Sequence, residues 1–233
     1  MSYPQVGDLV YAYTRLPTVQ SGTYAEMIAI PESYVALQPK SLKSFQSASV
    51  PLVGLTAFQA LHEVGKIKKN DKVLIIGGSG GVGSFAIQFA KIAGAKVTAI
   101  ASKSNINYLK QLGADHVIDY TSENIKTSAS KLQPNGFDIV FDAVGGESLK
   151  IGSQLIHKDS RVVSIVETPE NGSFHFVYPN GKQLEQIAQL FDAGLLQVPS
   201  LQVRSINEAA AAHDENQQRH VQGKVVLAID FAP

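Results

Sequence analysis

The chain has 233 residues, of which 44% are apolar, enough to build one large domain or two small ones. It has no cysteine, which excludes disulfides, thiolate metal ligands and a cysteine nucleophile, and its formal charge of zero offers no electrostatic basis for binding nucleic acid. No apolar run approaches the roughly 20 residues that span a bilayer, and the start of the chain lacks signal-peptide features, so we expect no membrane partner and a cytoplasmic location.

The N-terminal part of the chain is rich in β-forming residues and turn signals. We predict β segments at Val6–Tyr13 and Thr23–Ile30, bounded by glycine-containing turns. A helix is expected at Ala48–Val64, where the chain enters its middle part.

From Lys72 onward, short β-rich runs alternate with helical stretches, which predicts parallel strands joined by crossover helices. The predicted strands, continuous apolar runs as expected beneath helices on both faces, are Val73–Gly77, Lys96–Ala101, His116–Asp119, Asp138–Asp142, Arg161–Val166 and Phe174–Tyr178. The predicted helices are Gly81–Ala93, Asn105–Leu112, Glu123–Leu132, Glu147–His157 and Lys182–Ala193. This order indicates an α/β fold with a doubly wound parallel sheet.

The C-terminal part departs from this alternation. Leu201–Arg204, Asn207–Gln218 and Lys224–Asp230 predict a strand, a helix and a strand. We expect the two ends of the chain to form a second, smaller module together.

The stretch Asp71–Gly83 is an apolar strand followed by a glycine loop and a helix. Gly78, Gly80 and Gly83 satisfy G-x-G-x-x-G, in which the first glycine makes a tight turn, the second admits a pyrophosphate, and the third lets helix pack on strand. Because free N–H groups at the start of the helix attract an anion, the stretch predicts a dinucleotide site.

Two other enzyme classes use similar loops. A phosphate-binding NTPase loop needs a lysine where this chain has Ser84, which excludes that class. The short-chain dehydrogenase loop also fits, and Tyr178 and Lys182 have the spacing of that family's catalytic pair. The turn sequence between them, Pro179–Gly181, should keep them off a common helix, so this alternative is disfavoured.

Six motifs in this order resemble the medium-chain dehydrogenase/reductase superfamily, and within it the zinc-independent, quinone oxidoreductase-like branch. They are Gly22–Glu26, Pro51–Leu61, Asp71–Gly83, Leu112–Tyr120, Phe137–Gly146 and Gly223–Leu227. The resemblance implies a partial GroES-like catalytic domain at 1–40, a Rossmann domain at 41–180, and a segment returning to the catalytic domain at 181–233. Members usually carry a substantial stretch before the equivalent of Val6–Val10, so part of the expected substrate cleft has no counterpart here.

The end of the second Rossmann strand carries the signal for cofactor choice. An NAD site usually has Asp or Glu there, but this chain reads Ala101-Ser102-Lys103, a hydrogen-bond donor followed by a positive charge, which predicts NADPH. The resemblance implies that Lys103, Tyr120 and Arg219 contact the 2′-phosphate. Asn105 is expected to cap the next helix.

The other predicted cofactor contacts follow the strands. Gly80, Gly81 and Val82 should face the pyrophosphate, and Val144 and Gly145 the adenosine or ribose. By resemblance, the residues near the nicotinamide are Ser164, Ile165, Val166, Phe176 and Val177. Thr56 is a candidate contact to the nicotinamide phosphate or ribose, or a helix cap.

The resemblance implies an NADPH-dependent oxidoreductase that transfers hydride to a small-molecule acceptor, a quinone or an α,β-unsaturated carbonyl. A homodimer that pairs the edge strand Phe174–Tyr178 is common in the family. Zinc-dependent relatives use cysteine ligands, and the histidines here lack paired metal spacing, so we predict no metal. No catalytic residue can be named, and an NADPH-binding protein without turnover remains the alternative.

Overall fold

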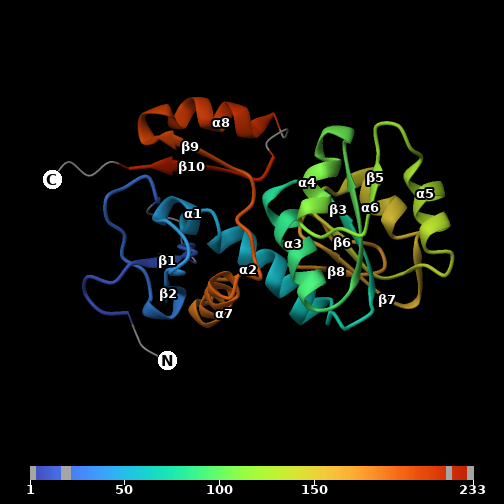
Figure 1. The fold of residues 1–233 in the computed structure, drawn as a ribbon, viewed down its shortest axis with the longest axis horizontal. Helices are drawn as coiled ribbons and strands as arrows, with labels where there is room; N and C mark the ends of the chain where they lie inside the picture. The colour runs from blue at the N-terminus through green and yellow to red at the C-terminus, as the bar shows by residue number, and fades with distance from the viewer. Residues whose placement is uncertain (1–3, 17–21, 219–221, 230–233) are drawn as a thin grey trace. The chain divides into compact units, whose positions relative to one another are not determined.

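The computed structural model describes residues 4–16, 22–218 and 222–229, shown as a ribbon in Figure 1. The chain forms two compact units. The terminal unit comprises Met1–Leu55 and Tyr178–Pro233, and the central unit comprises Thr56–Val177. Within the described residues, every helix is too short or too polar to span a bilayer.

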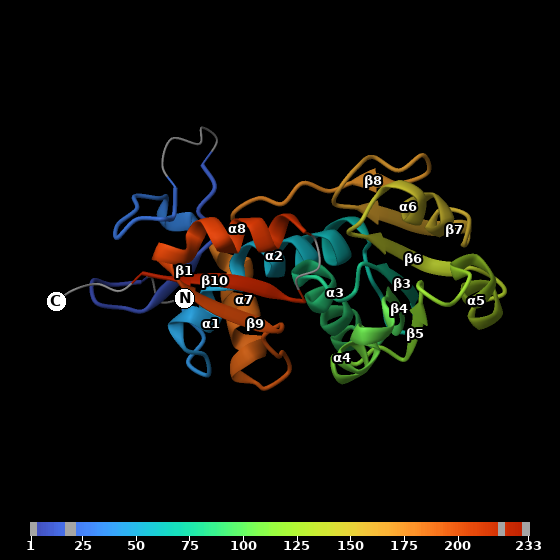
Figure 2. The same cartoon turned by 90° about the horizontal axis from the view of Figure 1, so that it is seen from above.

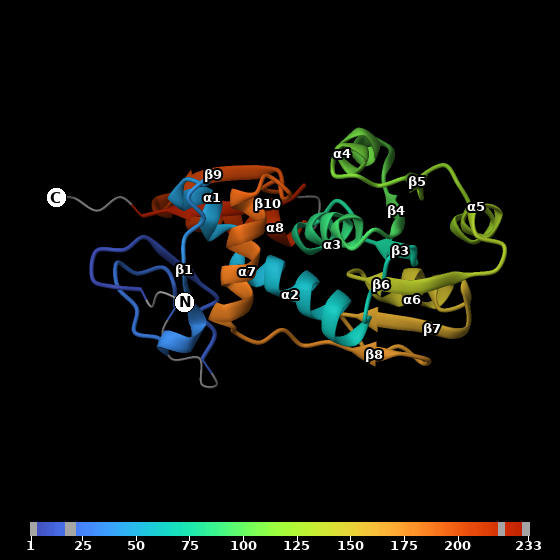
Figure 3. The same cartoon turned by 60° about the horizontal axis from the view of Figure 1, so that its bottom comes forward.

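The central unit contains a six-stranded parallel sheet in the order β5-β4-β3-β6-β7-β8, which Figures 2 and 3 show from two directions. Its strands are β3 (Lys72–Ile76), β4 (Lys96–Ala101), β5 (His116–Asp119), β6 (Phe137–Asp142), β7 (Ile156–Ser164) and β8 (Ser173–Phe174). Numbered within the unit, the order is 3-2-1-4-5-6, the doubly wound Rossmann arrangement. The predicted fold class is therefore confirmed.

Helices cover both faces of this sheet, as the continuously apolar strands predicted. They are α3 (Gly81–Ile92), α4 (Ile106–Gln111), α5 (Ile125–Leu132) and α6 (Gly146–Gly152), with the 3-10 turn η3 (Lys103–Asn105) before α4. Figure 1 shows α3 and α4 on one side of the sheet and α5 and α6 on the other.

Each face has its own apolar core. Strand residues such as Leu74 pack with Ala129 of α5 and Leu149 of α6. In α3, Phe85 and Phe89 are buried, with their ring centroids 5.8 Å apart. Burial of this kind stabilises the fold by about 2 kcal/mol for each large apolar side chain, so the sheet is a rigid base for the loops at its ends.

Several predicted boundaries in the central unit are wrong, and the strand expected at Arg161–Val166 is Ile156–Ser164. The helix expected to reach His157 ends at Gly152, because Ile156 already pairs with Phe137 as the start of β7. The strand expected at Phe174–Tyr178 is only Ser173–Phe174, because β7 ends at Ser164 and offers no further partner.

The terminal unit combines short strands and helices from both ends of the chain. Its elements are β1 (Val10–Ala12), η1 (Glu32–Tyr34), β2 (Val35–Leu37), α1 (Ser44–Ala48), α7 (Gly181–Asp192), β9 (Leu201–Ser205), η4 (Ile206–Glu208), α8 (Ala209–Gln217) and β10 (Lys224–Ala228). β1 and β2 pair antiparallel, and β9 and β10 pair parallel. Both ends of the chain belong to this one compact unit, whose bounds differ from the predicted 1–40 and 181–233.

The other differences lie in the N-terminal part. Residues Thr23–Ile30 form no strand, because in the described structure no neighbouring strand supplies hydrogen bonds and nearly all of these side chains are exposed. The helix expected at Ala48–Val64 begins at Pro51, as α2 (Pro51–Gln59), and continues into a π-helical turn, η2 (Ala60–Val64), while α1 precedes it. Proline at the first position of α2 explains the new start.

Candidate functional site

The strands of the central sheet end at a common level. Ile76 of β3 aligns with Ile100 of β4 and with Asp142 of β6, and Asp142 aligns with Ser164 of β7. The loops that follow β3, β4, β5, β6 and β7 therefore meet at one end of the sheet, which we call the carboxyl edge. Doubly wound folds bind their ligands there, where the strand order reverses.

Close packing in the glycine loop at this edge leaves no room for a side chain at two of its positions. A Cβ on Gly83 would lie 2.1 Å from the carbonyl oxygen of Gly77, and a Cβ on Gly78 would lie 2.8 Å from Leu109 Cδ2. Among the glycines of this loop, Gly77 has a positive φ of 83°, which a tight turn requires. The turn expected at Gly78 is thus made by Gly77, and Gly78 is needed for packing, whereas Gly83 has its predicted role.

The first backbone N–H groups of α3 are available to donate hydrogen bonds to a ligand. Its N-cap residue is Gly80, which has no side chain to bond the first N–H groups, and a Cβ there would meet only Gly77 O, at 3.6 Å. In the described structure, Gly81 and Val82 donate none of the loop hydrogen bonds. Free N–H groups at the positive end of a helix bind anions, so this site fits a pyrophosphate.

The loops after β4 and β5 bring the predicted phosphate residues together. The Tyr120 N–H donates to the carbonyl oxygen of Ala101 at 3.2 Å, which places Tyr120 beside Ser102 and Lys103. The Asp119 carboxylate accepts a hydrogen bond from the Lys103 N–H. Lys103 is exposed and Tyr120 is 55% exposed, so both can reach a ligand. Arg219 lies outside the described residues.

Asn105 has a different role from the one expected. Its side chain makes no capping bond to α4 and instead donates from Nδ2 to Ser102 Oγ at 2.9 Å. Ser102 Oγ also lies 3.1 Å from Ser104 Oγ. The capping prediction is therefore wrong, and Asn105 orients the hydroxyl of Ser102.

Asp119 makes the loop after β5 sensitive to acid. Hydrogen bonds from the hydroxyls of Thr121 and Ser122 lower the pKa of the Asp119 carboxyl. A carboxylate with a depressed pKa stabilises the fold above its unfolded pKa of about 3.9, and that contribution is lost as the pH falls through the folded value. Asp119→Asn should therefore lower the melting temperature at pH 7 and match the wild type more closely below pH 4. Calorimetry between pH 3 and pH 7 checks this, and a constant gap would contradict it.

A buried carboxylate holds the loop after β6. Asp142 is fully buried and accepts hydrogen bonds from the N–H groups of Val144 and Gly145, at 3.1 and 3.0 Å. Its Oδ2 also accepts from Ser164 Oγ at 2.7 Å. Asp142 is thus structural, and the Ser164 hydroxyl faces Asp142. The anchoring of Val144 and Gly145 was missed, although Asp two residues before a loop N–H is a known turn signal.

Apolar side chains are exposed where the cofactor contacts were predicted. Among the described residues of the central unit, the exposed large apolar side chains are Ile92, Tyr120, Val144, Val166, Phe174 and Phe176. All but Ile92 and Phe174 are predicted cofactor contacts. Such a coincidence is expected when an apolar surface serves to bind a ligand.

The other predicted nicotinamide residues present less side chain. Thr56 in α2 is 5% exposed and Val177 is 8% exposed, while Ile165 is half-buried. Phe176 and Val177 follow β8, whereas they were predicted to lie within that strand. Contacts from these residues to a ligand would come mainly from the backbone or from small surfaces.

The donor set does not fit a catalytic zinc. The chain has no cysteine, and its described residues hold no group of three His, Cys, Asp or Glu side chains able to bind a metal ion. Of the histidines, His157 bonds Asp138 at 3.1 Å and His213 bonds the Tyr24 hydroxyl at 2.7 Å. We therefore derive no zinc-dependent step.

The short-chain catalytic pair is not formed. α7 begins at Gly181, so Lys182 is helical while Tyr178 precedes the helix. The side chain of Asn180 caps α7 by accepting a hydrogen bond from the Gln183 N–H at 3.1 Å. The turn expected between the two residues is thus present.

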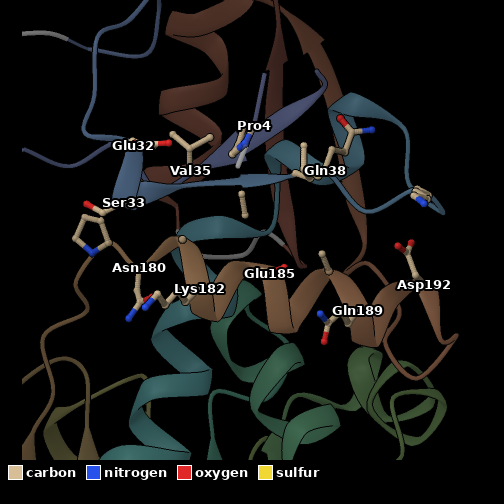
Figure 4. A pocket seen from close by; sticks show the side chains of 16 residues that line it. Pro4, Glu32, Ser33, Val35, Gln38, Asn180, Lys182, Glu185, Gln189 and Asp192 are labelled. Carbon is tan, nitrogen blue, oxygen red and sulfur yellow. The ribbon is translucent and has the colours of Figure 1, made fainter. Parts of the chain in front are cut away.

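A cavity of about 680 Å³ lies in the terminal unit, between β2 and α7. Figure 4 shows its mixed lining, with Glu32 and Gln38 on one side and Lys182, Glu185 and Asp192 on the other. None of the predicted cofactor residues lines this cavity. The glycine loop and the loops that carry Ser102, Lys103, Tyr120, Val144 and Gly145, in contrast, lie at the carboxyl edge of the central sheet.

Comparison with known proteins identifies the family of the chain. The family described as zinc-binding dehydrogenase matches residues 81–188. The NAD(P)H oxidoreductase RTN4IP1, mitochondrial, of Danio rerio is 30% identical over 98% of this chain and 68% of its own length. The NADPH-dependent alkenal/one oxidoreductase, chloroplastic, of Arabidopsis thaliana is 33% identical, over 95% and 58%.

Solved structures share the complete fold of the described chain. The quinone oxidoreductase from Coxiella burnetii matches with a TM-score of 0.88 and 29% identity, over 99% of this chain and 74% of its own. This chain spans about two thirds of the length of the RTN4IP1 relatives that it matches. With its Rossmann sheet and the GroES-like module formed by its two ends, the chain belongs to the medium-chain dehydrogenase/reductase superfamily, as a quinone oxidoreductase-like member.

Proposed function

We propose that this protein is an NADPH-dependent, zinc-independent oxidoreductase that reduces a quinone or an α,β-unsaturated carbonyl. One observation carries the proposal. At the carboxyl edge, the first N–H groups of α3 are available to a ligand, and the loop with Ser102 and Lys103 lies at the same edge. Relatives whose names include NAD(P)H oxidoreductase and NADPH-dependent alkenal/one oxidoreductase support it.

The residues of the chain would bind and orient the cofactor. The first N–H groups of α3 neutralise the pyrophosphate, and Lys103 and Ser102 bind a 2′-phosphate that an acidic residue would repel. Asp142 keeps the loop with Val144 and Gly145 in place before the cofactor arrives.

When bound, NADPH would supply a hydride, and the acceptor takes up that hydride and one further proton, which is two electrons and two protons in total. The apolar side chains of Val166 and Phe176 would exclude water beside the nicotinamide. Without a metal, hydrogen-bond donors must stabilise the enolate or quinol oxygen, and the proton comes from water or a tyrosine hydroxyl.

The test has two steps. Titration of the full chain with NADPH, followed by fluorescence, should show saturable binding that is tighter than for NADH. A quinone and an α,β-unsaturated ketone are then added separately, and the absorbance of NADPH should fall with one of them. Binding without oxidation of NADPH by either acceptor would favour the alternative, an NADPH-binding protein without turnover.

We also propose that two copies pair through the outer edge of β8. Phe174 is exposed there, and its ring centroid lies 6.4 Å from that of Phe176, which follows the strand. Exposed edge strands with apolar side chains readily pair with another chain, and a charged residue prevents it. Phe174→Lys should therefore convert a dimer to a monomer in analytical ultracentrifugation. Ile92→Lys, at an equally exposed apolar residue on α3, serves as the control.

A further inference from the structure

His175 follows β8 directly and is buried. Its N–H donates to the carbonyl oxygen of Ser164 at 2.8 Å, which holds it at the carboxyl edge, and only 8% of the residue is exposed. Its neighbours Phe174 and Phe176 are exposed. The ring of His175 is therefore directed into the central unit, and none of the roles described above uses it.

The partner of this ring is Gln59, the last residue of α2. The distance between His175 Nε2 and Gln59 Oε1 is 3.2 Å, and Gln59 is fully buried. Because an amide oxygen only accepts, Nε2 carries a proton and donates. Burial lowers the pKa of His175, against the opposing charge of Glu63, which agrees with a neutral ring.

The bond joins two segments that flank the predicted nicotinamide position. Thr56 lies three residues before Gln59 on α2, on the same helical face. Phe176 and Val177 follow His175 in the chain. The π-helical turn η2 begins immediately after Gln59, and such turns in a helix are frequent at functional sites.

We infer that His175 is a positioning residue: its hydrogen bond to Gln59 fixes the spacing between the Thr56 face of α2 and the Phe176–Val177 segment. That spacing sets how tightly the nicotinamide half of the cofactor is held. The adenosine half, bound by the loops after β3, β4, β5 and β6, does not depend on it. The inference rests on the proposed function.

The experiment compares NADPH with adenosine 2′,5′-bisphosphate, which lacks the nicotinamide. His175→Phe and Gln59→Leu should each weaken NADPH binding about fivefold, the effect of one hydrogen bond, and leave bisphosphate affinity unchanged. The double variant should lose less affinity than the sum of the two single losses, because both substitutions remove the same bond. His175→Gln retains a donor and should restore NADPH affinity to within about twofold of the wild type.

The control is His157→Phe, the same substitution at a histidine near the start of β7 that bonds Asp138, which should leave both affinities unchanged. Equal losses for both ligands, or unchanged NADPH affinity, would overturn the role of His175. If the wild-type chain binds neither ligand, the proposed function itself fails.

Discussion

Replacing Gly83 by alanine is expected to destabilise the protein by about 3 kcal/mol and to abolish NADPH binding. The new Cβ would lie 2.1 Å from the carbonyl oxygen of Gly77, and this neighbour is backbone, so it cannot turn away as a side chain could. The start of α3 would have to move away from β3, taking the open N–H groups with it. Chemical denaturation measures the loss of stability, and fluorescence titration measures the loss of binding.

Gly80→Ala is the matched control for this experiment. A Cβ there has no contact closer than 3.6 Å, so the unfolding free energy should change little. The methyl group would stand where the pyrophosphate approaches, which should weaken NADPH binding by about tenfold. If Gly80→Ala is as unstable as Gly83→Ala, or binds NADPH normally, the assignment of this loop to the pyrophosphate is wrong.

Lys103→Glu should weaken NADPH binding by about thirtyfold and leave NADH binding nearly unchanged. The substitution replaces an attraction for the 2′-phosphate by a repulsion, whereas NADH has only a hydroxyl at that position. Because Lys103 is exposed, the effect should shrink as salt is added. Titrations with both cofactors at low and high ionic strength measure it.

Lys110→Glu makes the same charge change on the exposed face of α4. If it weakens NADPH binding as much as Lys103→Glu does, the effect is a general one of net charge. Tyr120→Phe is informative as well, because it removes only the hydroxyl. A wild-type preference for NADH would refute the whole 2′-phosphate assignment.

The sheet and its order could be predicted because local patterns determine them. Apolar runs such as Lys96–Ala101 are strands with the predicted bounds, and Gly83 is required where the motif places it. The ends of elements depend on partners that are distant in sequence. β8 is short because β7 ends, and Thr23–Ile30 is not a strand because the described structure gives it no strand partner.

The side-chain interactions of the site were the hardest to predict. Asn105 has the residue type of a helix cap, but its side chain makes no capping bond to α4, and its Nδ2 donates to Ser102 Oγ. The contact between Gln59 and His175 joins residues 116 positions apart, and no spacing rule connects them. The predicted contacts to the cofactor are mostly backbone groups, so residue type alone carries little information about them.

The exposed apolar side chains at the carboxyl edge have a consequence for the abundance of the protein in the cell. On the proposed function, NADPH binds only the folded chain, and at a hundred times its Kd it adds about 2.7 kcal/mol to stability by mass action. Bound NADPH would also cover Val144, Val166 and Phe176. Without the cofactor, these side chains form an exposed apolar surface that can associate with other molecules. Chains without cofactor are then the ones that aggregate or meet proteases, so the abundance of the protein follows the supply of reduced cofactor.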